Sequence, residues 1–301
     1  MKGTIIKKAL SISLTTILAL SLAFALVACG GGASSQSSSS ASSAASSGSG
    51  SASSSASKEL TKLVVGATPA PHAEILNFIK DDLAAQGYEL QVVEYSDYVK
   101  PNLDTRDGII VANFFQHQPY LDEFNSKNGT ELVSVVAVHF EPLGIYPGKT
   151  KSLADLPDGA TIAIPNDTTN EARALLLLEA QGLIKLPANA DLTVTPRDIV
   201  DNPKNLKFAE LEAAAIPAML ADADLGVING NYAIGAGIDT STVLAKEDPK
   251  SQAADTYANT LVVNKGFEND PGVQALIKAL TSEKTRQFIN DNYGGAVIPV
   301  F

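Results

Sequence analysis

The feature that most constrains the fold of this chain is a short apolar run followed at once by a strongly helical segment. Residues 161–164 (TIAI) form an apolar run that ends at Pro165 and is typical of a buried strand. Residues 172–180 are rich in Leu and Ala, which favour a helix, and Thr168 with Glu171 matches a capping box at its start. Only a tight turn fits between the two. The segment therefore predicts a strand–turn–helix unit of an α/β protein.

The turn at residues 166–170 is suited to binding an anion. The first backbone N–H groups of a helix have no partner inside it and can donate to a carboxylate or a phosphate. Asn170 and Arg173 lie three residues apart and share a helix face near this end. A cation such as Arg173 is unfavourable near the positive N-terminal end of a helix, and a bound carboxylate would offset this unfavourable charge interaction. A surface salt bridge of Arg173 would account for the residue equally well, so both interpretations stay open at this point.

The same alternation of strands and helices extends from about residue 60 to the end of the chain. Strands are predicted at residues 60–65, 90–95, 109–115, 132–140, 206–211, 225–228, 242–245 and 257–263. Helices are predicted at residues 72–85, 119–127, 213–220 and from 270 to about 292, and a loop or short helix at 97–107. Such alternation implies mostly parallel sheets with helices on both faces.

Two breaks in this pattern suggest that the chain crosses twice between two lobes. Residues 141–148 hold two Pro and two Gly, and residues 246–255 are polar. We therefore expect lobe 1 to comprise residues 58–141 and 256–301, and lobe 2 to comprise residues 142–255. Two lobes of this size fit the length of the chain.

The N-terminal segment has the organisation of an export signal. Lys2, Lys7 and Lys8 precede an apolar run that ends in Ala28 and Cys29. A small residue before Cys at this position resembles the lipobox of bacterial lipoproteins, which implies that residues 1–28 are a signal peptide and that Cys29 carries the lipid. A transmembrane anchor or a plain signal peptide is the alternative. Cys29 is the only cysteine, so no intramolecular disulfide can form.

The segment after Cys29 and the net charge restrict the function further. Residues 31–57 are Ser, Ala and Gly with the single exception of Gln36, so residues 29–57 form a flexible tether whose coil would span roughly 30 Å. Without the three lysines of the signal, 33 acidic residues face 19 basic ones, a formal charge of −14. This acidity argues against nucleic-acid binding.

Candidate binding residues follow three predicted strands at their carboxyl ends. Phe115 and His117 follow residues 109–113, Asn170 and Arg173 follow residues 161–164, and Asn229 follows residues 225–228. In open α/β sheets, ligands bind beyond the carboxyl ends of the strands, so these side chains are expected to face one cleft. His117 could instead cap the next helix.

Three other polar residues have a structural interpretation. His72 and His139 are expected at the surface or in packing contacts. Asn231, which follows Gly230, is expected to be a turn residue rather than a ligand contact.

Several segments in a fixed order resemble one known family. They are residues 113–122 (NFFQHQPYLD), 165–170 (PNDTTN) with Arg173, 202–206 (NPKNL), 227–233 (VINGNYA) and 294–297 (GGAV). Together they resemble the methionine-binding lipoproteins of ABC importers, the NlpA/MetQ-type family. Thr168 stands where that family usually has Pro, and both residues suit the start of a helix.

The resemblance implies a fold and a set of site residues. The fold would be a two-lobed clamshell like that of periplasmic binding proteins, which closes over a free amino acid. Arg173 would bind the ligand carboxylate with Asn170 nearby, and Asn229 would contact the polar groups on the α-carbon. The ligand side chain would be enclosed by Phe115, His117 and Tyr120.

The implied function is the capture of methionine by a lipid-anchored protein on the extracytoplasmic face of the cell membrane. L-methionine is the expected ligand, with D-methionine as an alternative, and the partners would be an ABC permease and its ATPase. No cofactor, metal ion, catalytic residue or nucleic acid is expected. Another small apolar amino acid or a dipeptide, or an adhesin role, stays open. An enzyme is disfavoured, since the chain has no Gly-x-Ser-x-Gly and no His-Glu-x-x-His motif.

Overall fold

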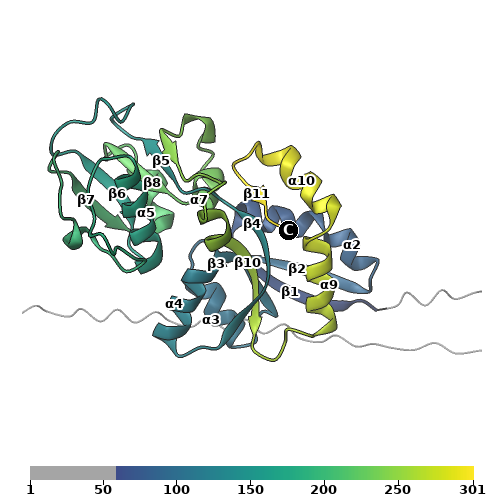
Figure 1. Cartoon of the computed structure of the whole chain (residues 1–301). Helices are drawn as coiled ribbons and strands as arrows, with labels where there is room; N and C mark the ends of the chain where they lie inside the picture. Colours follow the sequence, from purple (N-terminus) through teal and green to yellow (C-terminus); the bar gives the residue numbers. More distant parts are fainter. Residues whose placement is uncertain (1–58) are drawn as a thin grey trace, which may run out of the picture. The chain divides into compact units, whose positions relative to one another are not determined.

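The computed structural model describes residues 59–301, and the predicted signal peptide, Cys29 and the tether lie outside the described residues. Residues 59–301 contain two β-sheets flanked by helices (Figure 1). The two-lobed α/β fold expected from the sequence is confirmed. Within this range, no helix combines the length and the apolar character needed to cross a membrane.

The sheet of lobe 1 has six strands in the order β11-β4-β10-β3-β1-β2. They are β1 (Thr61–Ala67), β2 (Tyr88–Glu94), β3 (Ala112–His117), β4 (Leu132–Phe140), β10 (Ala258–Asn264) and β11 (Ile298–Pro299). Strand β1 pairs in parallel with β2 and β3, whereas β10 is antiparallel to β3 and β4. Strand β10 comes from the far end of the sequence, so the last part of the chain completes the first sheet.

The sheet of lobe 2 has five strands in the order β7-β6-β8-β5-β9. They are β5 (Gly144–Pro147), β6 (Thr161–Pro165), β7 (Lys207–Leu211), β8 (Leu225–Ile228) and β9 (Ala245–Lys246). Strand β6 is parallel to β7 and β8, whereas β5 is antiparallel to β8 and β9. Both sheets are therefore mixed, and the strands that adjoin the two crossings supply most of the antiparallel pairs.

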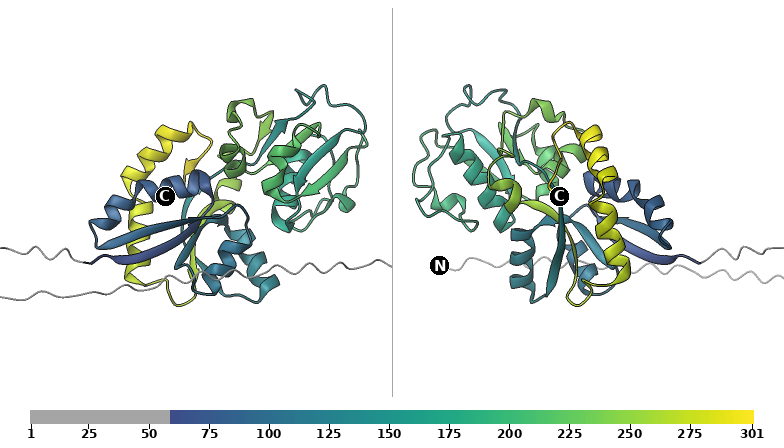
Figure 2. Two further views of the ribbon diagram at one scale, coloured as in Figure 1. Left: turned by 180° about the vertical axis from the view of Figure 1, so that it is seen from behind. Right: turned by 45° about the vertical axis from the view of Figure 1, so that its right-hand side comes forward.

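Helices cover both faces of the lobe 1 sheet (Figure 2). One face packs on η1 (Pro69–Ala73), α1 (Glu74–Phe78), α2 (Lys80–Ala84), α9 (Pro271–Leu280) and α10 (Glu283–Tyr293). The other face packs on α3 (Lys100–Arg106) and α4 (Gln118–Asn128). Phe114 joins the first core and Phe115 the second, as the alternation of side chains along a strand predicts. Phe115 is thereby directed to the α4 side.

Lobe 2 is built around α5 (Thr168–Ala180), whose leucines pack on β6 and β8. The opposite face of this sheet packs on α6 (Ile216–Met219) and α7 (Gly230–Gly235). The remaining elements of the lobe and its return crossing are short. They are η2 (Pro196–Asp198), η3 (Ala213–Ala215), η4 (Thr240–Thr242) and α8 (Ala253–Thr256).

Several predicted boundaries differ from the structure. The helix predicted at residues 72–85 is divided at Ile79, and the one predicted from 270 to 292 is divided at Thr281 and Ser282. Ser282 accepts from the backbone N–H of Thr285 and so caps a new helix. Residues 144–147 of the predicted crossing form β5, because extended backbone there completes the ladder with β8.

The capping box predicted from Thr168 and Glu171 is wrong. Asp167 is the N-cap of α5, and its carboxylate accepts from the backbone N–H of Asn170 at 3.1 Å. Thr168 is already the first helical residue. Asp is a stronger N-cap than Thr, so the helix starts one residue earlier than the box requires.

Candidate functional site

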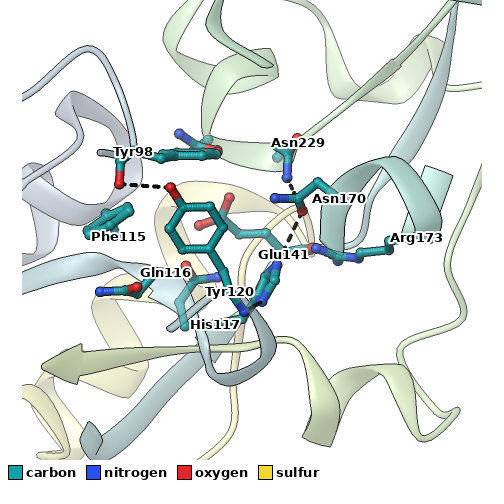
Figure 3. Close-up of a pocket in the computed structure, with 12 residues that line it drawn as sticks. Tyr98, Phe115, Gln116, His117, Tyr120, Glu141, Asn170, Arg173 and Asn229 are labelled. Carbon is teal, nitrogen blue, oxygen red and sulfur yellow. Dashed lines mark hydrogen bonds between the residues drawn. The ribbon is translucent and has the colours of Figure 1, made fainter. Parts of the chain in front are cut away.

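A cavity lies between the two lobes and is lined by all six predicted binding residues (Figure 3). The residues that line it are Tyr98, Phe115, Gln116, His117, Tyr120, Glu141, Asn170, Arg173, Asn229, Gly230, Asn231 and Asn259. The loops and helix starts that follow β3, β6 and β8 meet here, so strand ends distant in sequence form one site.

Asn170 organises the lobe 2 side of the cavity through hydrogen bonds. Its Nδ2 donates to Asp167 Oδ1 at 2.8 Å, which fixes the orientation of the amide. Its Oδ1 then accepts from Asn229 Nδ2 at 2.9 Å and lies 3.2 Å from His117 Nε2. Both ends of the Asn170 amide are thus engaged by protein groups. The residue positions its neighbours, and Asn229 Oδ1 is left buried without a hydrogen-bond partner among the residues that the structure describes.

His117 has both roles that the sequence left open. Its Nδ1 accepts from the backbone N–H of Tyr120 and caps α4. Because Nδ1 is an acceptor, the neutral ring carries its proton on Nε2 and donates to Asn170 across the two lobes. Burial and the charge of Arg173 lower the pKa of His117 to about 3, so the ring is neutral at physiological pH.

Arg173 is buried and already holds a protein carboxylate. Its Nε and Nη2 each donate to Glu247 at 2.6 Å, and Nη2 also donates to the Glu141 carbonyl at 3.0 Å. The guanidinium carbon lies 4.1 Å from the centre of the Tyr257 ring. Burial alone would lower the pKa of Arg173, but the nearby Glu247 carboxylate more than offsets it and the pKa is raised. The surface salt bridge considered for Arg173 is therefore excluded, because Arg173 itself is buried and its partner in the return crossing, Glu247, is only 10% exposed.

Glu141 adds a second carboxylate to the site, at the point where the chain leaves β4. Its Oε1 lies 2.7 Å from His139 Nε2 and 3.4 Å from His72 Nε2, and all three side chains are buried. The surface position considered for His72 and His139 is wrong, and the packing position is right. Burial lowers the pKa of His72 to about 4 and that of His139 to about 3. The two rings are therefore neutral donors beside Glu141.

Asn231 also lines the cavity, which contradicts its interpretation as a turn residue alone. It lies in the first turn of α7, and its Oδ1 accepts from the Tyr98 hydroxyl at 2.6 Å. Its Nδ2 is buried and has no hydrogen-bond partner within residues 59–301. In this part of the chain, the cavity thus presents an amide donor, Asn231 Nδ2, and an amide acceptor, Asn229 Oδ1, that no protein group engages.

Aromatic rings form the opposite wall. Tyr98 lies 5.6 Å from Phe115 and 5.7 Å from Tyr120, measured between ring centres, and the Tyr120 hydroxyl donates to the Tyr98 carbonyl. Gln116 supports this wall from behind, because its amide bonds to Asn102 and Asn113 in a buried network. The wall is largely aromatic, and it suits an uncharged ligand side chain.

Sequence reasoning missed Tyr98, Glu141, Asn231, Glu247 and Asn259. Tyr98 stands in a polar segment and Glu247 in a polar crossing, where nothing in the local pattern marks them. Glu141 could have been found, since a charged residue directly after the apolar run 132–140 must be either exposed or paired.

Comparisons with known proteins show which sequences this chain is similar to. The family model described as NlpA lipoprotein matches residues 63–301. The methionine-binding lipoprotein MetQ of Bacillus subtilis is 40% identical over 250 residues, which cover 79% of this chain and 88% of that protein.

Solved structures show the same likeness. A nutrient-binding protein of Burkholderia cenocepacia bound to methionine has a TM-score of 0.75 at 40% identity, covering 79% of this chain and all of the other. A periplasmic substrate-binding protein of an ABC transporter from Coxiella burnetii has a TM-score of 0.74 at 39% identity, with the same coverage.

Proposed function

This chain belongs to the NlpA lipoprotein family, and we propose on that basis that it captures methionine and delivers it to an ABC permease. The single observation that carries the proposal is the cavity between the lobes, where three features converge. They are a buried guanidinium, two amide atoms that have no hydrogen-bond partner in the described part of the chain, and an aromatic wall. A free amino acid with an uncharged side chain complements all three.

In this proposal Arg173 binds the ligand carboxylate. Its Nε and Nη2 donate to Glu247, whereas no hydrogen bond of Nη1 to any residue in 59–301 is present. Nη1 and the free Nδ2 of Asn231 are then the donors offered to the ligand. The cost of burying a carboxylate is offset when it is paired and hydrogen-bonded, and a guanidinium meets both needs.

The ligand side chain would lie against Tyr98, Phe115 and Tyr120. Aromatic rings make favourable contacts with a thioether, and an apolar wall leaves no partner for a charged side chain. His117 supports this enclosure in neutral form, because its pKa is lowered to about 3. Methionine fits this wall, and the relatives whose names state methionine support the choice.

Capture would proceed by closure of lobe 2, residues 142–255, onto lobe 1, residues 58–141 and 256–301. The two crossings between the sheets are the hinge of this motion. The lipidated Cys29 would hold the protein at the extracytoplasmic face of the cell membrane, and the tether would let it reach the permease. Replacement of Cys29 by Ala should release the protein from membranes without changing its affinity for methionine.

Thermal unfolding with each of the twenty amino acids and with D-methionine tests the ligand assignment. The protein is first denatured and refolded to remove co-purified ligand. At a ligand concentration of 1,000 times Kd, binding adds about 4 kcal/mol to the free energy of unfolding. A shift with methionine alone is expected. A shift with another amino acid would change the substrate, and no shift with any amino acid would contradict the proposal.

A further inference from the structure

Two hydrogen bonds join the lobes outside the cavity that the proposed function uses. Lys127 Nζ, in the last turn of α4, donates to Thr168 Oγ1, the first residue of α5, at 2.9 Å. The Tyr232 hydroxyl, on α7, donates to the backbone carbonyl of Ser96 at 3.1 Å. Lys127 and Ser96 belong to lobe 1, whereas Thr168 and Tyr232 belong to lobe 2. We call these two bonds the outer bonds.

The outer bonds differ from the bonds that join the lobes inside the cavity. His117 with Asn170 and Tyr98 with Asn231 also cross between the lobes, and all four of these residues line the cavity. Within residues 59–301, the side chains that line the cavity do not include the four residues of the outer bonds. A ligand enclosed in the cavity is therefore held by other groups.

Neighbouring side chains direct both donors of the outer bonds. Glu123, one turn earlier on α4, forms an ion pair with Lys127. The Tyr232 ring lies 5.0 Å from the Tyr98 ring of the opposite lobe, measured between ring centres. The ammonium group and the hydroxyl group are thus oriented by contacts that do not depend on a ligand.

The outer bonds border a second cavity, which adjoins the first. Its lining includes Asp97, Tyr98 and Tyr120 of lobe 1 and Asn166, Asp167 and Tyr232 of lobe 2, and we call it the outer cavity. Tyr98 and Tyr120 line both cavities, so a ligand that leaves between these rings enters the outer cavity. In the sequence, Thr168 directly follows one lining segment and Ser96 directly precedes another. The exit from the cavity is therefore flanked by the outer bonds.

The outer bonds can form only while the lobes are closed. Opening at the hinge separates Lys127 from Thr168 and Tyr232 from Ser96, and water then hydrates all four groups. A contact made in the closed form alone shifts the equilibrium toward that form. Because a ligand enclosed between the lobes leaves only after they open, the same contact lowers the rate of release.

We propose that the Lys127–Thr168 and Tyr232–Ser96 bonds form a latch that slows the release of methionine. The inference rests on the proposed function and deepens it, because it names the residues that control how long the ligand is held. These are positioning residues, since they join the two lobes and do not touch the ligand. The latch lowers the rate constant of release, koff, and leaves that of association, kon, nearly unchanged, because it forms after the ligand has entered.

Stopped-flow kinetics of methionine binding and release by the full chain tests the latch. Tyrosine fluorescence reports binding, because the chain has no tryptophan and Tyr98 and Tyr120 line the cavity. Thr168→Val keeps the shape of the side chain without the acceptor, and Tyr232→Phe keeps the ring without the donor. Each variant should raise koff about 2- to 10-fold, the effect of one net hydrogen bond, with kon changed by less than about 2-fold. The double variant should raise koff by the product of the two effects.

The matched controls lose the same chemical groups within one lobe. Thr193→Val removes a hydroxyl that donates to Asp191 in lobe 2, and Tyr293→Phe removes one that donates to Glu74 in lobe 1. Both controls should keep the koff of wild type.

The outcomes separate the latch from the proposed function. An unchanged koff in both latch variants overturns the latch and leaves the proposed function standing, as does a lower kon at unchanged koff. A rise of koff in one variant alone removes the other bond from the latch. Wild type that does not bind methionine overturns both proposals. If Thr168→Val does not fold, Lys127→Met keeps the apolar stem, loses the ammonium group and tests the same bond.

Discussion

Replacement of Arg173 by Ala should destabilise the fold as well as abolish methionine binding. The guanidinium makes two hydrogen bonds of 2.6 Å to Glu247 and one of 3.0 Å to the Glu141 carbonyl, and it stacks on Tyr257. Without it, the Glu247 side chain, which is 10% exposed, keeps one hydrogen bond within residues 59–301, from the backbone N–H of Leu143 at 2.8 Å. A largely buried carboxylate then loses its counter-charge.

The magnitude follows from the burial of this pair. Removal of one partner of a buried ion pair costs about 3–5 kcal/mol. For a described region of this size, each kcal/mol lowers Tm by about 2–4 °C, so a decrease of roughly 6–20 °C is expected. The double variant Arg173→Ala, Glu247→Gln removes the unpaired charge and should recover about 1–3 kcal/mol of that loss, although it still does not bind methionine.

Urea denaturation of wild type, both single variants and the double variant measures this coupling as a double-mutant cycle. Lys265→Ala is the matched control, since the Lys265–Glu131 pair is exposed and should contribute less than about 1 kcal/mol. If Arg173→Ala were as stable as wild type, or if the double variant were no more stable than Arg173→Ala, the buried pair would not have the role assigned to it.

Three further predictions concern the cavity and the start of α5. Burial and the nearby Glu210 raise the pKa of Glu171 to about 7, so the stability that depends on its protonated form is present at low pH and lost as pH rises through 7. In urea denaturation, the free energy of unfolding of Glu171→Gln should rise by about 1–3 kcal/mol relative to wild type between pH 5 and 8. Parallel pH profiles of the two proteins would refute this. Gly230→Ala would place a methyl group 2.7 Å from Glu141 Cβ. Calorimetry should therefore show weaker methionine binding, and urea denaturation should show a loss of about 1–3 kcal/mol in the free energy of unfolding. An unchanged affinity and stability would contradict this. Tyr98→Phe keeps the aromatic ring but loses the bond to Asn231, and a methionine Kd that rises by less than roughly 2-fold would show that this bond does not position the amide.

The local pattern of the sequence determined the fold class and the place of the site. Apolar runs in the sequence predict the strands, and the rule that ligands bind beyond strand ends predicts one cleft for the residues that follow them. These residues are Phe115, His117, Asn170, Arg173 and Asn229. The structure places all five in one cavity with Tyr120. This part could be predicted because the direction in which a parallel strand runs follows from short-range patterns alone.

Only the tertiary structure decided which partner each polar group has. The bond of Arg173 to Glu247 spans 74 residues, and that of His72 to Asn259 spans 187. No local pattern marks Glu247 or Tyr98, and the neutral state of His72 and His139 depends on burial that only the packed sheet provides. Charge state and pairing depend on what surrounds a group in space, and neighbours in sequence supply only a small part of those surroundings.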